Sequence, residues 1–423
     1  MEIKAGYKQT EIGGIPSDWD VKALGEIGEP TIGLTYKPED VREYGLLVLR
    51  SSNIGDNGLK FDDNVFVDVK VQDKLYTKPG DILVCVRNGS RPLIGKSALI
   101  DEDSAGYTFG AFMSVYRTDD SSFIFHLFNS NIIKRQIQRN IGATINQITN
   151  KDIRSFLVPF PITKDERIAI AEALSDADDL IANTEKLIAK KKDLKQGAMQ
   201  LLLSGKKRLA GFSGEWETKT IGDIFSISGG ISASRDKLSD EGYCYLHYGD
   251  IHGSNKSYID VGEEYLKIPK LKVNIKSINP KSLLNDGDVV FVDASEDDEG
   301  ASKHLVIKNQ NKIPYISGLH TIVLKSKDDS LVNLYKRYCF KTNNVKRQFK
   351  FYAVGTKVTG ISKTNIANVQ LLLPPTKEEQ SLVAQALSDL DNEIEGLEGK
   401  IAKYKLIKQG MAQELLTGKK RLV

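Results

Sequence analysis

The sequence predicts an α+β protein in which two related lobes of mixed α/β structure are joined by two long antiparallel coiled-coil helices with pseudo-two-fold symmetry. Three observations lead to this fold class. One stretch of the chain occurs twice, the repeated stretch has the composition of a long helix, and the segments before each copy alternate short apolar runs with polar turns. At 423 residues the chain is long enough for two to four domains of about 150 residues each.

The internal repeat decides the organisation of the chain. Residues 163–209 recur without a gap at residues 376–422, an offset of 376 − 163 = 213, and about 26 of the 47 aligned positions are identical. Weaker echoes upstream, Trp19 with Trp216 and Gly80 with Gly287, have other offsets because the segments between them diverged. The chain therefore alternates variable segments with constant tails, which suggests two related tasks on different targets.

Four segments follow from this alternation. We expect a first lobe over residues 1–160, a helical spacer over 161–210, a second lobe over 211–373 and a second spacer over 374–423. Within the lobes, short apolar runs predict strands over 46–49, 82–86, 289–292 and 321–324, and longer amphipathic runs predict helices over 123–140 and 331–351.

Each constant tail predicts a helix of about 40 residues, because it is rich in Lys, Leu, Ala, Asp and Glu. The apolar residues of the second tail follow a three-four spacing, which is typical of a coiled-coil seam. The first tail has Leu174, Ile181 and Ile188 on the equivalent seam and adds a row of leucines at intervals of seven. The candidate partner-binding residues on these tails are Leu180, Leu187, Leu194, Leu201, Leu387, Leu390, Ile394, Leu397, Ile401 and Tyr404.

Charge predicts the orientation of the two helices. The first half of each tail is mostly acidic and the second half mostly basic, so an antiparallel pair places each acidic half against a basic half. Equivalent antiparallel tails impose a pseudo-two-fold axis, which is how a protein with two readers matches a split DNA site. The alternative is that acidic starts and basic ends complement the helix dipoles only.

Basic and amide side chains gather on loops and helices of both lobes. Such residues suit phosphate contacts and base-edge readout, although a solvated helix face has the same composition. The loops differ between the lobes, and we expect them to read different bases. The candidate DNA-binding residues are Arg87, Asn88, Ser90, Arg91, Lys96, Lys134, Arg135, Arg139, Asn146 and Gln147 in the first lobe, and Ser295, Lys303, His304, Arg347, Lys350, Lys357 and Thr359 in the second.

Several function classes are disfavoured. A net charge of +3 argues against a uniformly basic nucleic-acid coat, so any DNA surface must be local. The three cysteines have no CxxC spacing and the five histidines no ligand spacing, so we expect no disulfide and no metal site. The stretch GSRPLIGKS from Gly89 has one residue too many for a phosphate-binding loop, and no catalytic motif is recognisable. No apolar run suits a membrane span and the start does not resemble a signal peptide, so we expect a cytoplasmic location.

The sequence resembles the specificity (S) subunit of type I restriction-modification systems over essentially its whole length. The resemblance is carried by IPSDW from Ile15, GDILV from Gly80, the TKDE and TKEE openings of the tails with LSDAD and LSDLD, and the two GKKRL endings. It implies two target recognition domains that each read one half of a bipartite double-stranded DNA sequence, with paired helices that set the spacer between the halves.

The resemblance also implies partners. Two methyltransferase (M) subunits dock on the helices and modify adenine with S-adenosylmethionine, and restriction (R) subunits add cleavage that depends on ATP and Mg. These cofactors belong to the partners, and the chain itself needs none and is not an enzyme. The residues alone leave an alternative open, a coiled-coil scaffold with two protein-binding lobes, which would lack steep salt dependence and a split DNA site.

Overall fold

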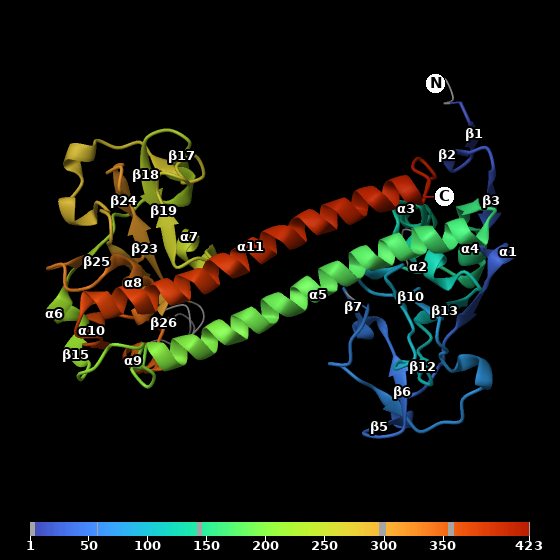
Figure 1. The fold of residues 1–423 in the computed structure, drawn as a ribbon, viewed down its shortest axis with the longest axis horizontal. Helices are drawn as coiled ribbons and strands as arrows, with labels where there is room; N and C mark the ends of the chain where they lie inside the picture. Colours follow the sequence, from blue (N-terminus) through green and yellow to red (C-terminus); the bar gives the residue numbers. More distant parts are fainter. Residues whose placement is uncertain (1–4, 57, 142–145, 296–301, 354–358, 423) are drawn as a thin grey trace. The chain divides into compact units, whose positions relative to one another are not determined.

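The computed structural model describes residues 5–56, 58–141, 146–295, 302–353 and 359–422. The chain packs as two compact units: unit 1 comprises Met1–Leu187 and Leu397–Val423, and unit 2 comprises Ile188–Gly396. Two long helices, α5 (Lys164–Leu202) and α11 (Lys377–Leu415), each contribute residues to both units (Figure 1). None of the helices in the described ranges is long and apolar enough to cross a membrane.

Unit 1 is built on two four-stranded sheets (Figure 1). The first has the antiparallel order β11 (Ser97–Leu99), β10 (Ile82–Cys85), β13 (Met113–Arg117), β4 (Glu29–Ile32). The second has the order β12 (Thr108–Phe109), β6 (Leu46–Leu49), β9 (Phe66–Val67), β5 (Val41–Arg42), with β12 parallel to β6. Three short pairs complete the strands: β1 (Tyr7–Thr10) with β2 (Gly13–Pro16), β3 (Trp19–Ala23) with β14 (Leu157–Pro161), and β7 (Ile54–Gly55) with β8 (Gly58–Leu59).

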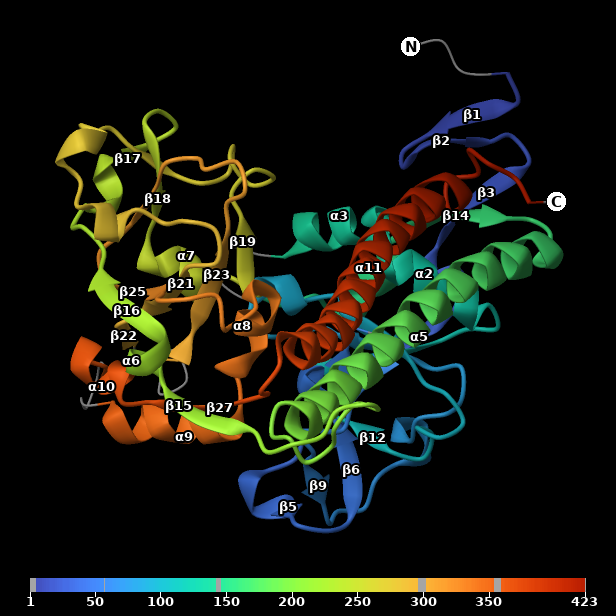
Figure 2. The same cartoon turned by 60° about the vertical axis from the view of Figure 1, so that its left-hand side comes forward.

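Unit 2 repeats this sheet plan with one added strand (Figure 2). Its larger sheet has the order β16 (Phe225–Gly229), β25 (Thr321–Ser326), β21 (Val289–Val292), β23 (His304–Lys308), β19 (Tyr258–Asp260). Its smaller sheet has the order β17 (Leu238–Ser239), β20 (Lys270–Leu271), β18 (Tyr243–Leu246), β24 (Tyr315–Ser317). The remaining pairs are β15 (Glu217–Thr220) with β27 (Gln370–Leu373), and β22 (Ala294–Ser295) with β26 (Thr359–Gly360). All four predicted apolar runs are strands.

Four of the shorter helices of unit 2 correspond to those of unit 1, and the helix over Tyr248–Gly253 has no α-helical counterpart in the described part of unit 1. The shorter helices are α1 (Leu24–Ile27), α2 (Ser121–Asn129), α3 (Asn131–Asn140) and α4 (Asn150–Ser155) in unit 1, and α6 (Ile221–Ile224), α7 (Tyr248–Gly253), α8 (Asn333–Cys339), α9 (Asn343–Tyr352) and α10 (Lys363–Ala367) in unit 2. The single helices predicted over 123–140 and 331–351 are wrong, since each is two helices. Ser130 and Thr342 cap the second helix of each pair by accepting hydrogen bonds from the backbone nitrogens of Ile132 and Val345, which starts a new helix direction.

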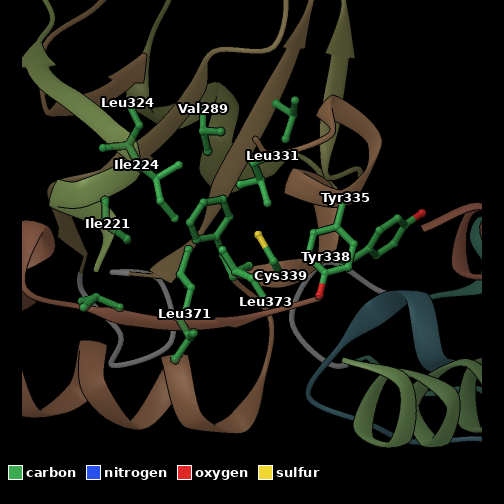
Figure 3. Packing of buried hydrophobic residues seen from close by; sticks show 14 of the residues in the cluster. Ile221, Ile224, Val289, Leu324, Leu331, Tyr335, Tyr338, Cys339, Leu371 and Leu373 are labelled. Atoms are coloured by element: carbon green, nitrogen blue, oxygen red, sulfur yellow. The ribbon is translucent and has the colours of Figure 1, made fainter. Parts of the chain in front are cut away.

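The lobes share their cores with the ends of the long helices. Figure 3 shows apolar residues of α6, α8 and β27 converging in unit 2, around Tyr335 and Cys339, and the same cluster includes Leu387 of α11. The equivalent cluster of unit 1 includes Leu174 of α5 and Leu415 of α11. Because each lobe and its helix ends bury one continuous core, the helices hold the lobe in a fixed orientation within its unit.

The two long helices run antiparallel within each unit. In unit 1 the Lys405 ammonium lies 2.8 Å from Glu185, and Lys408 pairs with Asp178. In unit 2 the Lys191 ammonium lies 2.7 Å from Glu393, and Lys195 pairs with Asp391. In both units the residue number rises along one helix as it falls along the other, and basic side chains of one helix meet acidic side chains of the other.

Candidate nucleic-acid interface

Two loops that were predicted separately to contact DNA lie together in unit 1. Arg87 forms an antiparallel bridge with Gln147, and the Asn88 backbone nitrogen donates to the Asn146 carbonyl at 3.3 Å. The Asn146 side-chain amide donates to the Gly89 carbonyl at 3.0 Å. Arg87 is exposed, and its guanidinium lies 4.9 Å from the centre of the Phe112 ring. The loop that follows β10 and the loop that precedes α4 thus form one polar surface.

A second group of predicted residues extends this surface over α3. Ile133 and Ile137 of α3 are buried, which leaves its basic side chains on the outer face. Arg91, on the loop after β10, donates to the Gln138 carbonyl of α3 at 3.5 Å, so the loop and the helix are neighbours. The exposed predicted residues here are Ser90, Arg91, Lys134, Arg135 and Arg139, while Lys96 is half-buried with its ammonium 3.6 Å from Asp56.

The equivalent surface of unit 2 carries less positive charge near the strand ends. Ser295 pairs with Thr359 through the backbones of β22 and β26, which follow β21 and precede α10. The side chains of these two residues, and all of Lys357, lie outside the described residues. Lys303 is exposed, and its ammonium donates to the His252 carbonyl at 3.1 Å. On α9, Arg347 and Lys350 are exposed.

His304 does not lie on this surface, and the prediction that it contacts DNA needs correction. Its ring is stacked on Phe291 with centroids 5.0 Å apart, it meets Phe340 edge-on, and only 5% of the residue is exposed. Burial lowers its pKa to about 3, so the ring is neutral at physiological pH. The sequence places His304 close after a strand end, but it begins β23 with its side chain toward the core.

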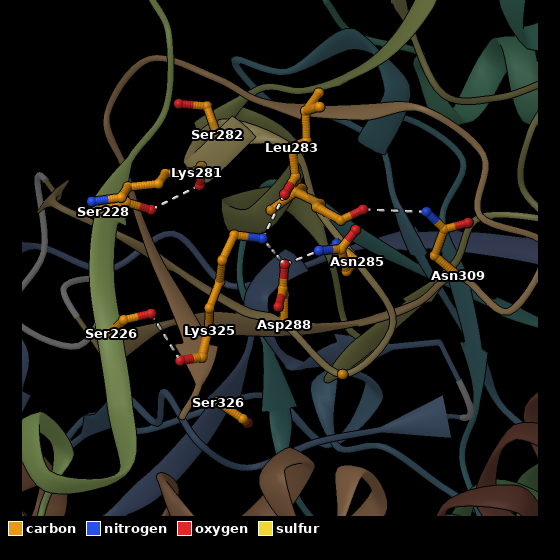
Figure 4. Close-up of polar contacts among 12 residues, drawn as sticks. Ser226, Ser228, Lys281, Ser282, Leu283, Asn285, Asp288, Asn309, Lys325 and Ser326 are labelled. Atoms are coloured by element: carbon orange, nitrogen blue, oxygen red, sulfur yellow. Dashed lines mark hydrogen bonds and ion pairs between the residues drawn. The ribbon is translucent and has the colours of Figure 1, made fainter. Parts of the chain in front are cut away.

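The repeated Gly-Asp motif at the start of β10 and β21 is structural. Asp81 accepts a hydrogen bond from the Lys78 backbone nitrogen and pairs with Arg117 of β13 at 2.9 Å. Asp288 accepts from the Asn285 nitrogen at 2.8 Å and from the Lys325 ammonium of β25, as Figure 4 shows. Burial raises the pKa of Asp288. Each aspartate anchors one end of a strand whose other end leads into the candidate DNA-binding loop.

Two arginine clasps hold the lobes on the helix ends, and sequence reasoning missed them. In unit 1 the Arg421 guanidinium pairs with the buried Glu166 and, at 3.0 Å, with Asp18, and it lies 5.7 Å from the Trp19 ring centre. The Trp19 indole also donates to Glu166, at 3.1 Å. Hydrogen bonds from Arg421 lower the pKa of Asp18.

Unit 2 has a similar arginine–glutamate pair, but the indole nitrogen of Trp216 is buried without a hydrogen-bond partner, whereas that of Trp19 donates to Glu166. Arg208 pairs with the buried Glu379 at 2.7 Å and lies 5.7 Å from the Trp216 ring centre. The signal for both clasps was present in the sequence, because Glu166 and Arg208 recur in the repeat as Glu379 and Arg421, and the weaker upstream echo pairs Trp19 with Trp216. What the repeat did not show is that the arginine comes from the opposite copy, which follows from the antiparallel helices.

The predicted partner-binding residues fall into two groups. On α5 the four leucines spaced by seven are exposed, between 42% and 55% of each residue: Leu180, Leu187, Leu194 and Leu201. On α11 the six predicted residues are buried or half-buried: Leu387, Leu390, Ile394, Leu397, Ile401 and Tyr404. The α5 row is therefore exposed in this chain, whereas the α11 row is partly or fully covered within it, and partner binding by either row stays a prediction.

Comparison with known proteins gives a consistent result. The sequence model of the type I restriction modification DNA specificity domain matches residues 16–191 and again 213–405. The StySPI specificity subunit of Salmonella potsdam is 25% identical over 396 residues, covering 88% of this chain and 82% of that protein. The putative MjaX specificity subunit of Methanocaldococcus jannaschii is 25% identical, covering 98% and 97%.

Solved structures share the fold. A chain from a structure of the type I R-M system has a TM-score of 0.59 at 18% identity and covers 96% of this chain and 99% of its own length. The S subunit of a type I restriction-modification system from M. genitalium has a TM-score of 0.57 at 15% identity, covering 98% of each chain.

Proposed function

The chain belongs to the type I restriction-modification DNA specificity family, and from that premise we propose that each of its two units reads one half of a bipartite DNA site. The chain is a specificity subunit, which recognises DNA within a type I complex and is not catalytic. The family membership removes the protein-binding scaffold that the residues alone left open. The proposal concerns the division of the DNA site between the units and the residues that contact it.

The observation that carries the proposal is that the two units repeat one fold but differ in the loops after β10 and β21. The unit 1 loop presents Arg87, Asn88 and Arg91 beside Asn146 and Gln147. Arginine suits guanine edges and asparagine suits adenine edges in the major groove. The unit 2 loop pair carries different side chains, so the two half-sites should differ in sequence.

The basic helices supply affinity without sequence choice. Lys134, Arg135 and Arg139 on α3, and Arg347 and Lys350 on α9, project from the outer faces of equivalent helices. Contacts of this kind go mainly to phosphates and position the protein on the duplex. We assign them to the backbone and the loops to the bases.

The helices act as a spacer in this proposal. We assign residues 1–160 and 211–373 to the two target recognition domains, and 161–210 and 374–423 to the paired spacers, related by a pseudo-two-fold axis. The antiparallel ion pairs within each unit support the assignment. The length of the helices then fixes how many base pairs lie unread between the half-sites.

The partners belong to the same proposal. Two M subunits dock on the helices, where the exposed leucines of α5 offer an apolar row, and R subunits complete the restriction complex. S-adenosylmethionine binds the M subunits, and ATP and Mg serve the R subunits, so the chain supplies sequence choice without a cofactor.

The test is a pair of arginine substitutions in unit 1. In the complex with its methyltransferase subunits, Arg87→Ala with Arg91→Ala should weaken modification by about 10-fold or more at sites that match the wild-type first half-site, with the second half-site unchanged. The readout is the set of modified adenines on host DNA, by single-molecule sequencing. An equal loss on all DNA contradicts base reading by these residues and indicates phosphate contact. Arg135→Ala is the control for a phosphate contact.

A further inference from the structure

The turn that leads into β13 in unit 1 and the turn that leads into β25 in unit 2 each present an exposed ring. Phe112 lies between β12 and β13, and its carbonyl accepts hydrogen bonds from the backbone nitrogens of Val86 at 3.0 Å and Arg87 at 3.1 Å. His320 lies between β24 and β25, and its carbonyl accepts from the Asp293 nitrogen at 3.1 Å. Both turns are thereby fixed to the start of the candidate DNA-binding loop.

Both rings face outward while their successors face the core. Phe112 is 55% exposed and the next residue, Met113, is 1% exposed. The His320 side chain is 49% exposed, and Thr321 after it is 3% exposed. A large exposed ring on a solvent-facing turn costs apolar hydration, and aromatic residues at such positions are enriched where another molecule binds.

A glycine behind each turn allows another part of the chain to approach the turn closely. A Cβ at Gly33 would overlap the Gly110 carbonyl, and a Cβ at Gly230 would overlap the Gly318 carbonyl. The chain can therefore pack closely against the turn from the end of β4 in unit 1 and from the end of β16 in unit 2. Each turn is thus closely packed from behind, which favours a preorganised position for its ring.

Each ring also has a charged partner from the candidate DNA-binding loop. The Arg87 guanidinium lies over the Phe112 ring at 4.9 Å, and the His320 Nδ1 lies 3.1 Å from an Asp293 carboxylate oxygen. The two partners have opposite charge. Tyr248 adds a further ring in unit 2, edge-on to His320 with centroids 5.5 Å apart.

His320 has a backbone conformation that a residue with a Cβ rarely adopts. Its φ is +57°, and among the described residues other than glycine only Lys312 shares a positive φ. Such conformations cost free energy for residues other than glycine and cluster at active sites and ligand-binding sites. The position would accept glycine without this cost, so the presence of histidine points to a use for the ring.

We propose that Phe112 and His320 are equivalent specificity-determining residues whose rings contact base edges, one in each half of the DNA site. This inference rests on the proposed function, since it names residues of the same surface. Phe112 offers an apolar ring, which suits a thymine methyl, beside an arginine that suits guanine. His320 and Asp293 together offer a hydrogen-bond donor and an acceptor instead of an apolar ring like that of Phe112. The paired turns thus present different chemistry to the two half-sites.

The test compares ring substitutions with exposed aromatic controls in the complete methyltransferase complex. Phe112→Ala should lower the preference for at least one base of the first half-site by about 10-fold and leave the second half-site unchanged. His320→Asn, which tolerates a positive φ and keeps a polar side chain, should relax the second half-site only. The controls Phe61→Ala in unit 1 and Tyr265→Ala in unit 2 remove exposed rings elsewhere and should leave the motif unchanged. Modified adenines are mapped for each variant, and thermal melting checks that the variants fold.

The outcomes separate the inference from the proposed function. If the wild-type complex gives a bipartite motif and both ring variants give the same motif, the rings do not read bases and the inference is overturned. If the Phe112 variant alters both half-sites equally, the assignment of one ring to one half-site is overturned. A wild-type complex that gives no bipartite motif contradicts the proposed function itself, before any variant is considered.

Discussion

The aspartates that link the two long helices each contact a third side chain from the lobe. In unit 1 Asp178 pairs with Lys408 and lies 3.9 Å from the Nδ1 of His126, whose Nε2 is 3.0 Å from the Ser175 hydroxyl. In unit 2 Asp391 pairs with Lys195 and accepts a hydrogen bond from the Tyr338 hydroxyl at 2.8 Å. The same junction therefore contains a titratable imidazole in one unit and a phenol in the other.

This difference predicts that unit 1 loses stability in mild acid. Burial lowers the pKa of His126 from 6.5 to about 4, so protonation favours the unfolded chain. The stabilising contribution is complete above about pH 6.5 and is lost as the pH falls toward 4, reaching a loss of about 2 kcal/mol at pH 5.

The measurement uses the two tryptophans, Trp19 in unit 1 and Trp216 in unit 2. With 5-fluorotryptophan, ¹⁹F NMR during urea unfolding follows each unit separately. Between pH 7 and pH 5, wild-type unit 1 should lose about 2 kcal/mol more than unit 1 of His126→Gln. An identical pH dependence in the two proteins contradicts the assignment to His126.

The arginine clasps predict a matched pair of stability effects. Arg421→Gln leaves Glu166, which is 1% exposed, with the Trp19 indole but without a cation. Removing one partner of such a buried pair costs about 3 kcal/mol, so unit 1 should unfold at lower urea concentration while unit 2 is unchanged. Arg208→Gln should lower the urea concentration at which unit 2 unfolds and leave unit 1 unchanged. The same two ¹⁹F resonances report the result, and equal destabilisation of both units by either variant contradicts a local clasp.

At the level of single residues, the sequence indicated which residue types suit DNA contact better than it indicated where those residues lie in the fold. The sequence placed Arg87 and Asn88 on one loop and Asn146 and Gln147 on another. Only the folded chain brings these two loops together. It placed His304 on the surface because proximity to a strand end does not say which way the first residue of a strand points. Phe112 carried no sequence signal, since an exposed aromatic and a core aromatic look alike without a burial pattern.

At the scale of elements, the basic helices α3 and α9 are part of the resemblance between the two units. Lys134, Arg135 and Gln136 on α3 recur as Lys346, Arg347 and Gln348 on α9. Each glutamine forms two hydrogen bonds with the backbone of a neighbouring strand, Gln136 with Leu157 of β14 at 2.8 and 2.9 Å, and Gln348 with Gln370 of β27 at 3.0 and 2.7 Å. The basic helices are thus held in the same way in both units.

The elements also show where sequence reasoning fails. Strands and long helices were predictable because burial imposes a run of apolar residues or a heptad spacing. The breaks at Ser130 and Thr342 were not, because a capping side chain in mid-sequence resembles any exposed polar residue of a helix. The pairing β3 with β14 joins residues far apart in the chain, which no local pattern indicates.

At the scale of the whole molecule, two units with one sheet plan and different loops support the proposal that one chain specifies a split site. The architecture was predictable because duplication left 47 aligned positions in each tail. The half-site sequences were not, because readout depends on loop side chains that vary between the two copies. We therefore propose that the two units read the two half-sites and that the long helices set the gap between them.

The most direct test of that claim maps modified adenines for the complex with its methyltransferase subunits, with the wild-type chain and with four residues inserted after Leu187 of α5. We expect the wild-type chain to give a bipartite motif with a fixed gap, and the insertion variant to give the same two half-sites with a longer gap. A changed half-site with an unchanged gap, or a continuous wild-type motif, contradicts it.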